Sequence, residues 1–530
     1  MNLTTFLARH HAVISSTNDA HVPLHNRRIG AVDMNEIFRA ANDDAAADLV
    51  RLRAMLLEPG DAKFSGRPLP VADGDALVGT GNVEIVDEEL ERLHPTTGTA
   101  RPFTVVEEKP DGPRRRFILW PKSQNDALQL DFRSQVPLTH VSGYLDAVLQ
   151  QSAVLRDLAL GFWQVDLSQS ERANFRFRLS DGRIAQPTRL PMGLCVSVDI
   201  MQRVTEILAG HPRSARDAFG KDPDVYIDGV RFAGSVDQCV AYARFIDARA
   251  ARFRVTLKER GEPPMANYTF IGVDFDHAKR SVVASAKTLR KLANDDVCAG
   301  VATFDTLRRF AGRLFHAAAC NRTPLAEFYF IIKKLRRLIS GFNRGVVQDC
   351  SLVELSSGFL LSTQDLVNRV HVPLVIREAT GAAPATLCTD ASLKGWGGVL
   401  FLPRGDMLVV GDKWGEQHLG ADISVLELEA VRLSLEALAV SLSAVGALSV
   451  RVDNSSALAS LVRGGARAEA LNTAVRNLAG AMRLFPFVVD VGYVKSAANP
   501  ADFPSRGLPV PRGFTKPILR GVPSRVARTA

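Results

Sequence analysis

Two stretches with short apolar runs predict paired strands, and each stretch holds a carboxylate. The first runs from Leu155 to Phe177 and holds Asp157 at the end of a short apolar run. The second, VYIDG at 225–229, places Asp228 just after or inside a short apolar strand. An Asp next to Gly usually indicates only a turn. If the two strands pair, however, their carboxylates meet on rigid elements, as a site for two Mg²⁺ ions requires.

A hairpin with basic residues is predicted just before these strands. The runs FTVV at 103–106 and RFILW at 116–120 flank a charged Pro-Asp-Gly turn, which is a hairpin signal. Such a hairpin can fold over a triphosphate. Lys109 would then act as a point charge and Arg116 as a fork matched to phosphate oxygens. A surface hairpin with a solvated basic tip is the alternative.

Other stretches show helical spacing of apolar residues. Residues 34–57 are helical in pattern, and we expect residues 1–95 to form an extension of unknown role that packs on the next domain. Two stretches near 307–319 and 328–342 are amphipathic and strongly basic. Packed helices with solvated faces explain them, but the basic faces also suit a duplex groove. Gly193, before a predicted helix, would let the backbone approach a base pair closely.

A new pattern of strands and helices begins at Ala385, and four carboxylates occupy its key positions. Asp390 and Asp453 end two strands, Glu427 lies inside a helix, and Asp502 lies in an Asn-Pro-Ala-Asp turn. Any one of them alone is typical of a cap or a surface acid. Without metal the four would repel one another strongly. The ordered set therefore predicts a second site for two Mg²⁺ ions, suited to hydrolysis of a phosphodiester.

Composition adds three constraints. The chain has 530 residues, 46% of them hydrophobic, which predicts several globular domains. The net charge of +8 fits either an ordinary basic enzyme or a protein that follows a polyanion through local grooves. The six scattered cysteines show no zinc spacing and indicate an intracellular protein. No signal pattern or membrane span is expected, and the sequence does not distinguish a cytoplasmic from a nuclear location.

The motifs together resemble those of a retroelement reverse transcriptase followed by a ribonuclease H domain. The polymerase motifs are DLALGFWQ (157–164), RLPMGL (189–194) and YIDG (226–229). The ribonuclease H motifs are CTDASLKGWGGVL (388–400), LELEAV (426–431), VDNSSA (452–457) and NPADFPSRG (499–507). The resemblance covers about residues 100–507. It is greatest to the DIRS-like elements of the tyrosine-recombinase order and, within these, to the trypanosomatid VIPER type.

This resemblance implies an α+β multidomain fold. A right-hand polymerase with fingers, a ferredoxin-like palm and a thumb would precede an α/β ribonuclease H-like domain. The expected parts are an N-terminal extension (1–95), fingers and palm (96–290), thumb and connection helices (291–380), a ribonuclease H domain (381–507) and a basic, disordered tail (508–530).

The resemblance also implies a role for each matching residue. Asp157 and Asp228 would hold metal together with the Leu158 carbonyl, and Phe162 would exclude a ribose 2′-hydroxyl. The nucleotide-binding set would be Lys109, Arg116, Phe162 and Gly193. The hydrolytic and metal-binding quartet would be Asp390, Glu427, Asp453 and Asp502. Two Mg²⁺ ions per site, with Mn²⁺ as a substitute, would act on an RNA template, a DNA primer, deoxynucleoside triphosphates and an RNA–DNA hybrid.

The sequence departs from the family pattern in three ways. Gly229 stands where the family usually has a second Asp, Met192 stands where it often has Gln, and Trp120 and Lys122 replace an Asp-x-Arg expected after Arg116. Two functions therefore remain open. One is a retrotransposon RNA-directed DNA polymerase with ribonuclease H activity. The other is a polymerase-like nucleic-acid-binding protein that has lost synthesis, with or without a surviving ribonuclease H. The oligomeric state stays open.

Overall fold

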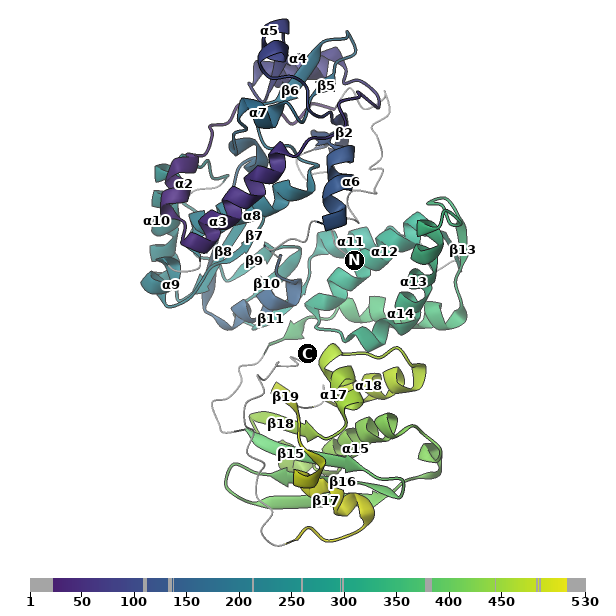
Figure 1. The fold of residues 1–530 in the computed structure, drawn as a ribbon. Coiled ribbons are helices and arrows are strands. Elements are labelled where there is room, and N and C mark those ends of the chain that lie inside the picture. Colours follow the sequence, from purple (N-terminus) through teal and green to yellow (C-terminus); the bar gives the residue numbers. More distant parts are fainter. Residues whose placement is uncertain are drawn as a thin grey trace. The chain divides into compact units, whose positions relative to one another are not determined.

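The computed structural model describes residues 22–107, 112–131, 136, 138–211, 214–258, 261–295, 297, 300–376, 384–443, 445–482, 485 and 488–511. It is a mixed structure of helices and sheets (Figure 1) with two compact units. The first unit joins residues 1–140 to 150–266, and the second joins 141–149 to 267–530. The five predicted domains follow a different division and stay a prediction. No helix within the described ranges has the length and apolar character of a membrane span.

The described part of the first unit begins with helices that start at polar caps. The side chains of Asp33, Asn42 and Asp87 accept hydrogen bonds from the first turns of three of them. Leu49 and Leu52 are buried in the unit's core, so this N-terminal region packs on the elements that follow it. The helices are α2 (Met34–Ala40), α3 (Asp43–Ala54), α4 (Val71–Gly79) and α5 (Glu88–Leu93).

An antiparallel three-stranded sheet lies at the centre of the first unit. Its strands are β4 (Ser152–Asp157), β8 (Gly229–Gly234) and β7 (Asp224–Tyr226), in that order. Helices α8 (Cys195–Ala209) and α10 (Val236–Arg252) pack on it. Strand β4, which ends at Asp157, pairs with β8, so the predicted pairing of the two stretches is confirmed. Asp228 itself lies in the turn between β7 and β8.

The remaining elements of the first unit include the predicted hairpin. Strands β2 (Arg101–Glu107) and β3 (Arg114–Trp120) pair antiparallel, with Phe103 opposite Ile118. Its tip, which includes Lys109, lies outside the described residues. The other elements are β1 (Val83–Val86), β5 (Phe177–Arg178), β6 (Ile184–Pro187), α6 (Lys122–Asp131), α7 (Gln169–Arg172) and α9 (Ser214–Phe219).

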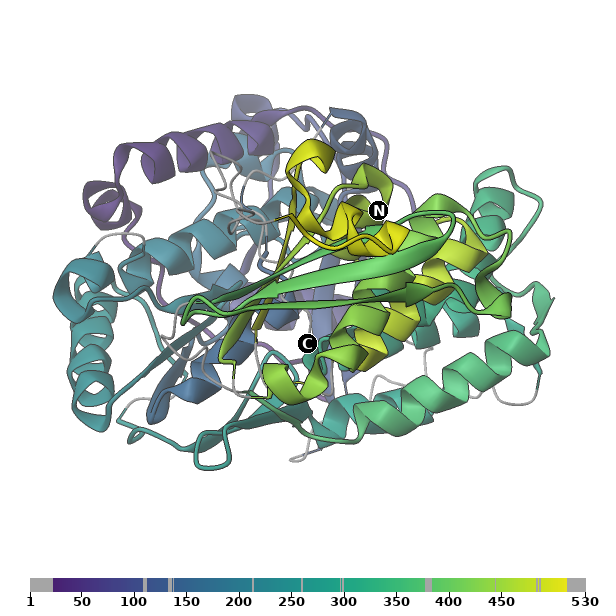
Figure 2. The ribbon, with the colours of Figure 1, turned by 90° about the horizontal axis from the view of Figure 1, so that it is seen from below.

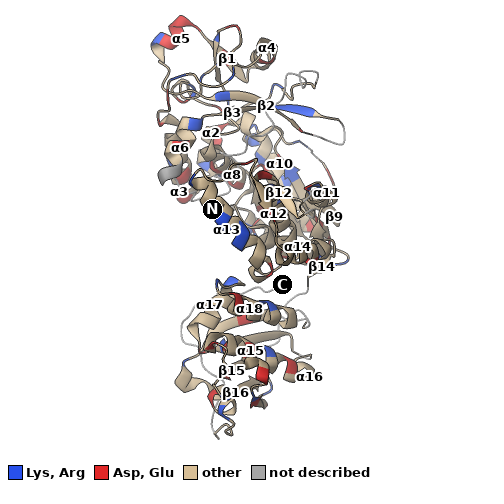
Figure 3. Cartoon of the chain, turned by 90° about the vertical axis from the view of Figure 1, so that its right-hand side faces the viewer, with Lys and Arg blue, Asp and Glu red and all other residues tan. Residues whose placement is uncertain are grey.

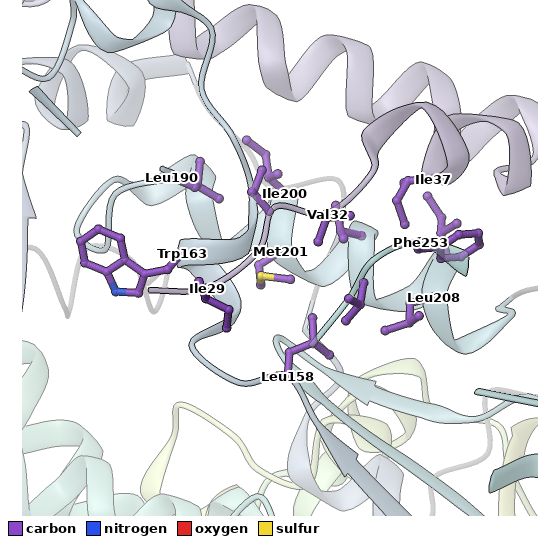
Figure 4. Packing of buried hydrophobic residues seen from close by; sticks show 14 of the residues in the cluster. Ile29, Val32, Ile37, Leu158, Trp163, Leu190, Ile200, Met201, Leu208 and Phe253 are labelled. Carbon is purple, nitrogen blue, oxygen red and sulfur yellow. The ribbon is translucent and has the colours of Figure 1, made fainter. Parts of the chain in front are cut away.

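One apolar core connects the N-terminal segment with the central sheet. Figure 4 shows Ile29 and Val32 close to side chains of the central elements, among them Leu158, Met201 and Phe253. All five are nearly inaccessible to solvent. Burying such side chains removes apolar surface from water, at about 25 cal/mol per Å². The N-terminal segment is therefore part of this unit's core.

The second unit contains a helical part and a small sheet. The sheet order is β14 (Leu374–Val375), β11 (Ser281–Ala284), β10 (Val273–Asp276), β9 (Asn267–Phe270). Strands β12 (Val301–Thr303) and β13 (Leu352–Glu354) form a separate pair. The helices are α11 (Ala286–Ala293), α12 (Phe304–Cys320), α13 (Tyr329–Asn343) and α14 (Ser357–Val370), with a 3₁₀ segment at Val141–Leu149.

A five-stranded sheet begins at Ala385. Its order is β17 (Met407–Lys413), β16 (Gly395–Phe401), β15 (Ala385–Ala391), β18 (Ala447–Val452), β19 (Val488–Tyr493). The β15, β18 and β19 strands are parallel, whereas β16 is antiparallel to both of its neighbours. Helices α15 (Ile423–Ala437), α17 (Ser455–Arg463) and α18 (Glu469–Met482) share an apolar core with this sheet. Figure 2 shows its strands in colours from green to yellow. The short helix α16 (Ala439–Leu442) follows α15.

Candidate active sites

The first candidate site is formed by Asp157 and Asp228. In the pairing of β4 with β8, Asp157 stands opposite Gly229, so Asp228 lies one residue from its cross-strand position. The Leu158 N–H donates to the Asp228 carbonyl at 2.9 Å. Burial, and next the negative charge of Asp157, raise the pKa of Asp228 above its ordinary value. The two carboxylates therefore share one electrostatic environment.

Two cations act on Asp228. The positive charges of Arg116 and Lys258 both oppose the rise in the pKa of Asp228. Lys258 is also tied to the site through its backbone, since its N–H donates to the Asp157 carbonyl at 2.8 Å. Arg116, on β3, forms an ion pair with Glu107 at 3.0 Å. Arg116 is predicted from the hairpin pattern, whereas Lys258 follows an ordinary apolar run without a motif of its own.

Gln164 fixes the segment that carries Lys258. Its side chain is fully buried and donates to the Ala159 carbonyl at 2.7 Å and to the Thr256 carbonyl at 2.9 Å. It also accepts from the Thr256 N–H at 2.7 Å. The Gln164 carbonyl in turn accepts from the Val32 N–H at 2.7 Å. One residue thus connects the loop after Asp157, the segment before Lys258 and the N-terminal segment.

Close packing also constrains Asp228. A Cβ atom at Gly161 would lie 3.0 Å from the Asp228 Cβ and 3.3 Å from the Met201 sulfur. The absence of a side chain at residue 161 therefore leaves the space in which Asp228 sits. The next residue, Phe162, is half-buried and packs against the unit's core. Its predicted role as a gate against ribose is not tested by this packing.

The local backbone packing explains why residue 193 is a glycine. Its φ is +131°, and a Cβ there would lie 2.5 Å from the Leu119 carbonyl oxygen. The Leu119 N–H donates to the Met192 carbonyl at 3.1 Å, and the Asn125 side chain donates to the Gly193 carbonyl at 2.7 Å. The glycine therefore lets this segment close against β3. Its predicted approach to a base pair stays a prediction.

The second candidate site brings three acids from distant positions together. Oxygen atoms of Asp390, Glu427 and Asp453 all lie within 4.8 Å of one another. Asp390 is near the carboxyl end of β15 and Asp453 directly follows β18, and these strands are parallel neighbours. Helix α15, which carries Glu427, packs against β15. Parallel strands end at the same edge of a sheet, which explains why the acids meet.

These acids are held at high electrostatic cost. Burial, followed by the charges of Asp453 and Asp390, raises the pKa of Glu427 to about 9. Burial, with the charges of Asp453 and Asp502, raises the pKa of Asp390 to about 6. The Glu427 Oε2 atom is buried without a hydrogen-bond partner. An all-oxygen donor set with an orphaned buried oxygen fits a hard divalent cation such as Mg²⁺.

Asp502 lies beside this cluster, on a 3₁₀ turn at Pro500–Asp502 that follows β19. Its charge raises the pKa of Asp390, although it is not one of the three acids within 4.8 Å. The Arg506 guanidinium pairs with Asp502 at 2.5 Å. Asp502 is therefore near enough to act on Asp390 electrostatically while a cation partly compensates its charge.

Two serines position acids of this cluster. The Ser505 hydroxyl, which is buried, donates to Asp390 Oδ2 and to the Asp502 carbonyl. The Ser496 hydroxyl donates to Asp453 Oδ2 at 2.5 Å. Sequence patterns alone predict no role for these serines or for Arg506. The NPADFPSRG motif contains Ser505 and Arg506, but a motif does not show which side chains meet.

Three solved structures of a viral reverse transcriptase are similar to this fold. The foamy viral protease–reverse transcriptase dRH in complex with double-stranded DNA has a TM-score of 0.47 and 14% identity, and the match covers 90% of this chain and 83% of that chain. The foamy viral protease–reverse transcriptase in complex with an RNA/DNA hybrid has a TM-score of 0.46 and 15% identity, and the match covers 92% of this chain and 64% of that chain. The same protein in complex with double-stranded DNA has a TM-score of 0.45 and 16% identity, and the match covers 89% of this chain and 99% of that chain. No protein-family model and no curated protein matches the sequence. At this level of likeness, functional inference rests on the two groups of carboxylates.

Proposed function

We propose that the chain is an RNA-directed DNA polymerase joined to a ribonuclease H, as encoded by a retrotransposon. The observation that carries the proposal is the convergence of Asp390, Glu427 and Asp453 within 4.8 Å, in the strand, helix, strand order that the ribonuclease H motifs require. The pairing of β4, which ends at Asp157, with β8, which directly follows Asp228, supports the polymerase half. The right-hand arrangement, the domain boundaries from 1–95 to 508–530 and the DIRS-like subtype are part of the same proposal.

In the polymerase half, Asp157, Asp228 and the Leu158 carbonyl would hold metal. Arg116, whose charge already acts on Asp228, would bind the incoming triphosphate together with Lys109. Phe162 would exclude a ribose 2′-hydroxyl, and Gly193 would contact the nascent base pair. Two Mg²⁺ ions, or Mn²⁺, would supply at each site a clamp for the attacking and leaving oxygens.

In the nuclease half, the quartet of Asp390, Glu427, Asp453 and Asp502 would hold the metal beside the RNA strand of a hybrid. Ser505 and Ser496 would keep two of these carboxylates in fixed orientations. Arg506 would limit the repulsion between Asp502 and Asp390. The fully ionised quartet is the form that binds metal, because a protonated carboxyl must lose its proton first.

A second function is favoured by one observation. Gly229, not a carboxylate, stands opposite Asp157. The polymerase half would then have a weaker metal site or none, and the chain would bind primer and template without extending the primer. The nuclease half is independent of this difference.

Two assays on the full chain test these functions. The first is primer extension on an RNA template with deoxynucleoside triphosphates and Mg²⁺. The second is cleavage of an RNA–DNA hybrid. We expect Asp157→Asn to abolish extension and preserve cleavage, and Asp390→Asn to do the reverse. A loss of three orders of magnitude corresponds to about 4 kcal/mol of transition-state stabilisation. Extension that survives Asp157→Asn, or cleavage that survives Asp390→Asn, would contradict the corresponding half.

A further inference from the structure

The two basic helices of the second unit, α12 and α13, differ in whether their positive charges form ion pairs within the fold. In α12, Arg308 pairs with Asp305 at 2.9 Å, and Arg309 pairs with the same aspartate at 2.9 Å. Arg313 pairs with Asp295. The charges of these three arginines therefore have partners within the fold.

Helix α13 keeps its positive charge at the surface. Ile331 and Leu335 are buried, whereas Lys333, Arg336 and Arg337 are exposed and lie three and four residues apart on one face. The helix contains no acidic residue. Arg336 and Arg337 form no ion pair with any residue in the described ranges. Figure 3 shows the Lys and Arg positions of α13 as blue parts of the ribbon.

The segment before α13 is joined to the loop between α17 and α18. The Ala326 N–H donates to the Gly464 carbonyl at 2.7 Å, and the Asn472 side chain donates to the Ala326 carbonyl at 2.9 Å. Arg463 ends α17 and Arg467 lies in the loop, and both are exposed. The basic face of α13 therefore continues onto the domain that holds the Asp390 cluster.

One acid lies within this region. Lys333 reaches the Glu469 carboxylate at 3.4 Å and the Tyr329 hydroxyl at 3.1 Å. This contact places the side chain of Lys333 beside the start of α18, two residues after Arg467. We define the α13 surface as the five exposed cations Lys333, Arg336, Arg337, Arg463 and Arg467. Five positive charges next to one carboxylate leave a net positive surface.

We propose that the α13 surface binds the sugar–phosphate backbone of a nucleic-acid duplex. This proposal rests on the proposed function and adds the place where the duplex is held. The acids of the Asp390 cluster repel phosphates, so affinity for a polyanion must come from cations elsewhere. Four of the five cations are arginines, whose planar guanidinium groups match phosphate oxygens. An array of cations along one helix also suits a partner whose charges repeat.

The test removes charge from the α13 surface of the full chain. The variant combines Lys333→Gln, Arg336→Gln and Arg337→Gln. Its matched control combines Lys333→Arg, Arg336→Lys and Arg337→Lys, which keeps three positive charges on the same helix face. Binding of a fluorescent RNA–DNA hybrid is measured by anisotropy in EDTA over a series of salt concentrations. Metal is left out so that binding is measured apart from cleavage, and thermal melting of each variant monitors folding.

The slope of log affinity against log salt falls by about 0.9 for each phosphate that the protein no longer neutralises. We expect the charge-removing variant to reduce this slope by about two to three and to bind at least about tenfold more weakly at 50 mM salt. The charge-keeping control is expected to retain the wild-type slope. At saturating hybrid with Mg²⁺, the cleavage rate of the charge-removing variant is expected to match that of wild type, because the Asp390 cluster is unchanged.

Two results separate this proposal from the proposed function. An unchanged salt slope in the folded charge-removing variant, with cleavage intact, would overturn the α13 surface and leave the nuclease in place. Such a result would favour an acidic protein as its partner. Hybrid binding that depends on the α13 surface, with no cleavage by wild type, would support the surface and overturn the nuclease.

Discussion

Asp157 and Gly229 are cross-strand partners where β4 ends and β8 begins. A carboxylate at residue 229 would stand opposite Asp157 and one residue from Asp228. Without metal, like charges directly opposite each other on two strands destabilise a sheet, by up to about 1 kcal/mol. With a divalent cation, the same carboxylate would add an oxygen ligand. Gly229 therefore favours stability of the metal-free strands over metal affinity.

Gly229→Asp tests whether a carboxylate at residue 229 raises metal affinity and lowers the stability of the metal-free protein. We expect the Mg²⁺ concentration for half-maximal primer extension to fall by about tenfold, which corresponds to about 1.4 kcal/mol. In EDTA, the free energy of unfolding should fall by about 0.5–1 kcal/mol. Gly229→Asn is the control, since it adds a side chain of similar size without charge. An equal gain in the Asn variant would show that charge is not the cause.

Gly161→Ala tests whether packing sets the position of Asp228. Its Cβ would lie 3.0 Å from the Asp228 Cβ, so Asp228 must move by a few tenths of an ångström. We expect primer extension to slow by about tenfold or more, since small misplacements of reacting groups are costly. Gly79→Ala, in α4 with nothing within 4 Å of its Cβ, is the control. Equal extension rates in the two variants would remove the proposed role of Gly161.

Glu427→Gln tests whether the raised pKa of Glu427 makes the stability of the metal-free protein depend on pH. The folded pKa of Glu427 is raised to about 9 from 4.5, so the folded state binds more protons between these values. In EDTA, stability should therefore fall as pH rises from about 4.5 to about 9. The Gln variant should lose this dependence and melt at a higher temperature than wild type at pH 9. Melting curves at pH 6 and pH 9 measure both effects, and parallel pH profiles of the two proteins would contradict the expectation.

Ser505→Ala tests whether a hydroxyl orients Asp390. The hydrogen bond from Ser505 lowers the pKa of Asp390, which burial raises to about 6. Its loss should raise this pKa further and shift the rise of hybrid cleavage to higher pH. A hydrogen bond to a charged group contributes about 1.5–3 kcal/mol, so cleavage at pH 7 should fall by about tenfold or more. Ser505→Thr keeps the hydroxyl and should restore much of the activity. An unchanged pH profile in Ser505→Ala would contradict this role.

The sequence predicts local elements and their order well because they depend on neighbouring residues. The strand ending in Asp157, the hairpin that carries Arg116 and the strand–helix–strand order around Glu427 all follow from apolar spacing and turn residues. The parallel pairing of β15 with β18 then brings Asp390 and Asp453 to one edge. Those acids could be predicted because each ends a strand.

Contacts between side chains far apart in sequence were beyond such prediction. Lys258 acts on Asp228 only because its segment folds back and its N–H meets the Asp157 carbonyl. The basic stretches of α12 and α13 look alike in sequence. The difference between them depends on Asp295 and Asp305, which lie where they neutralise the arginines of α12 alone.

The Val32 N–H donates to the carbonyl of Gln164, whose side-chain amide in turn holds both Ala159 and Thr256. Residues 29–33 are thus connected through Gln164 to the segments beside the carboxylates that are proposed to bind metal in the polymerase half. Any event that pulls this amino-terminal segment out of the core would loosen the loop after Asp157 and the Lys258 segment together. Access to the polymerase site is in this way coupled to the integrity of a part of the chain that carries no chemistry itself.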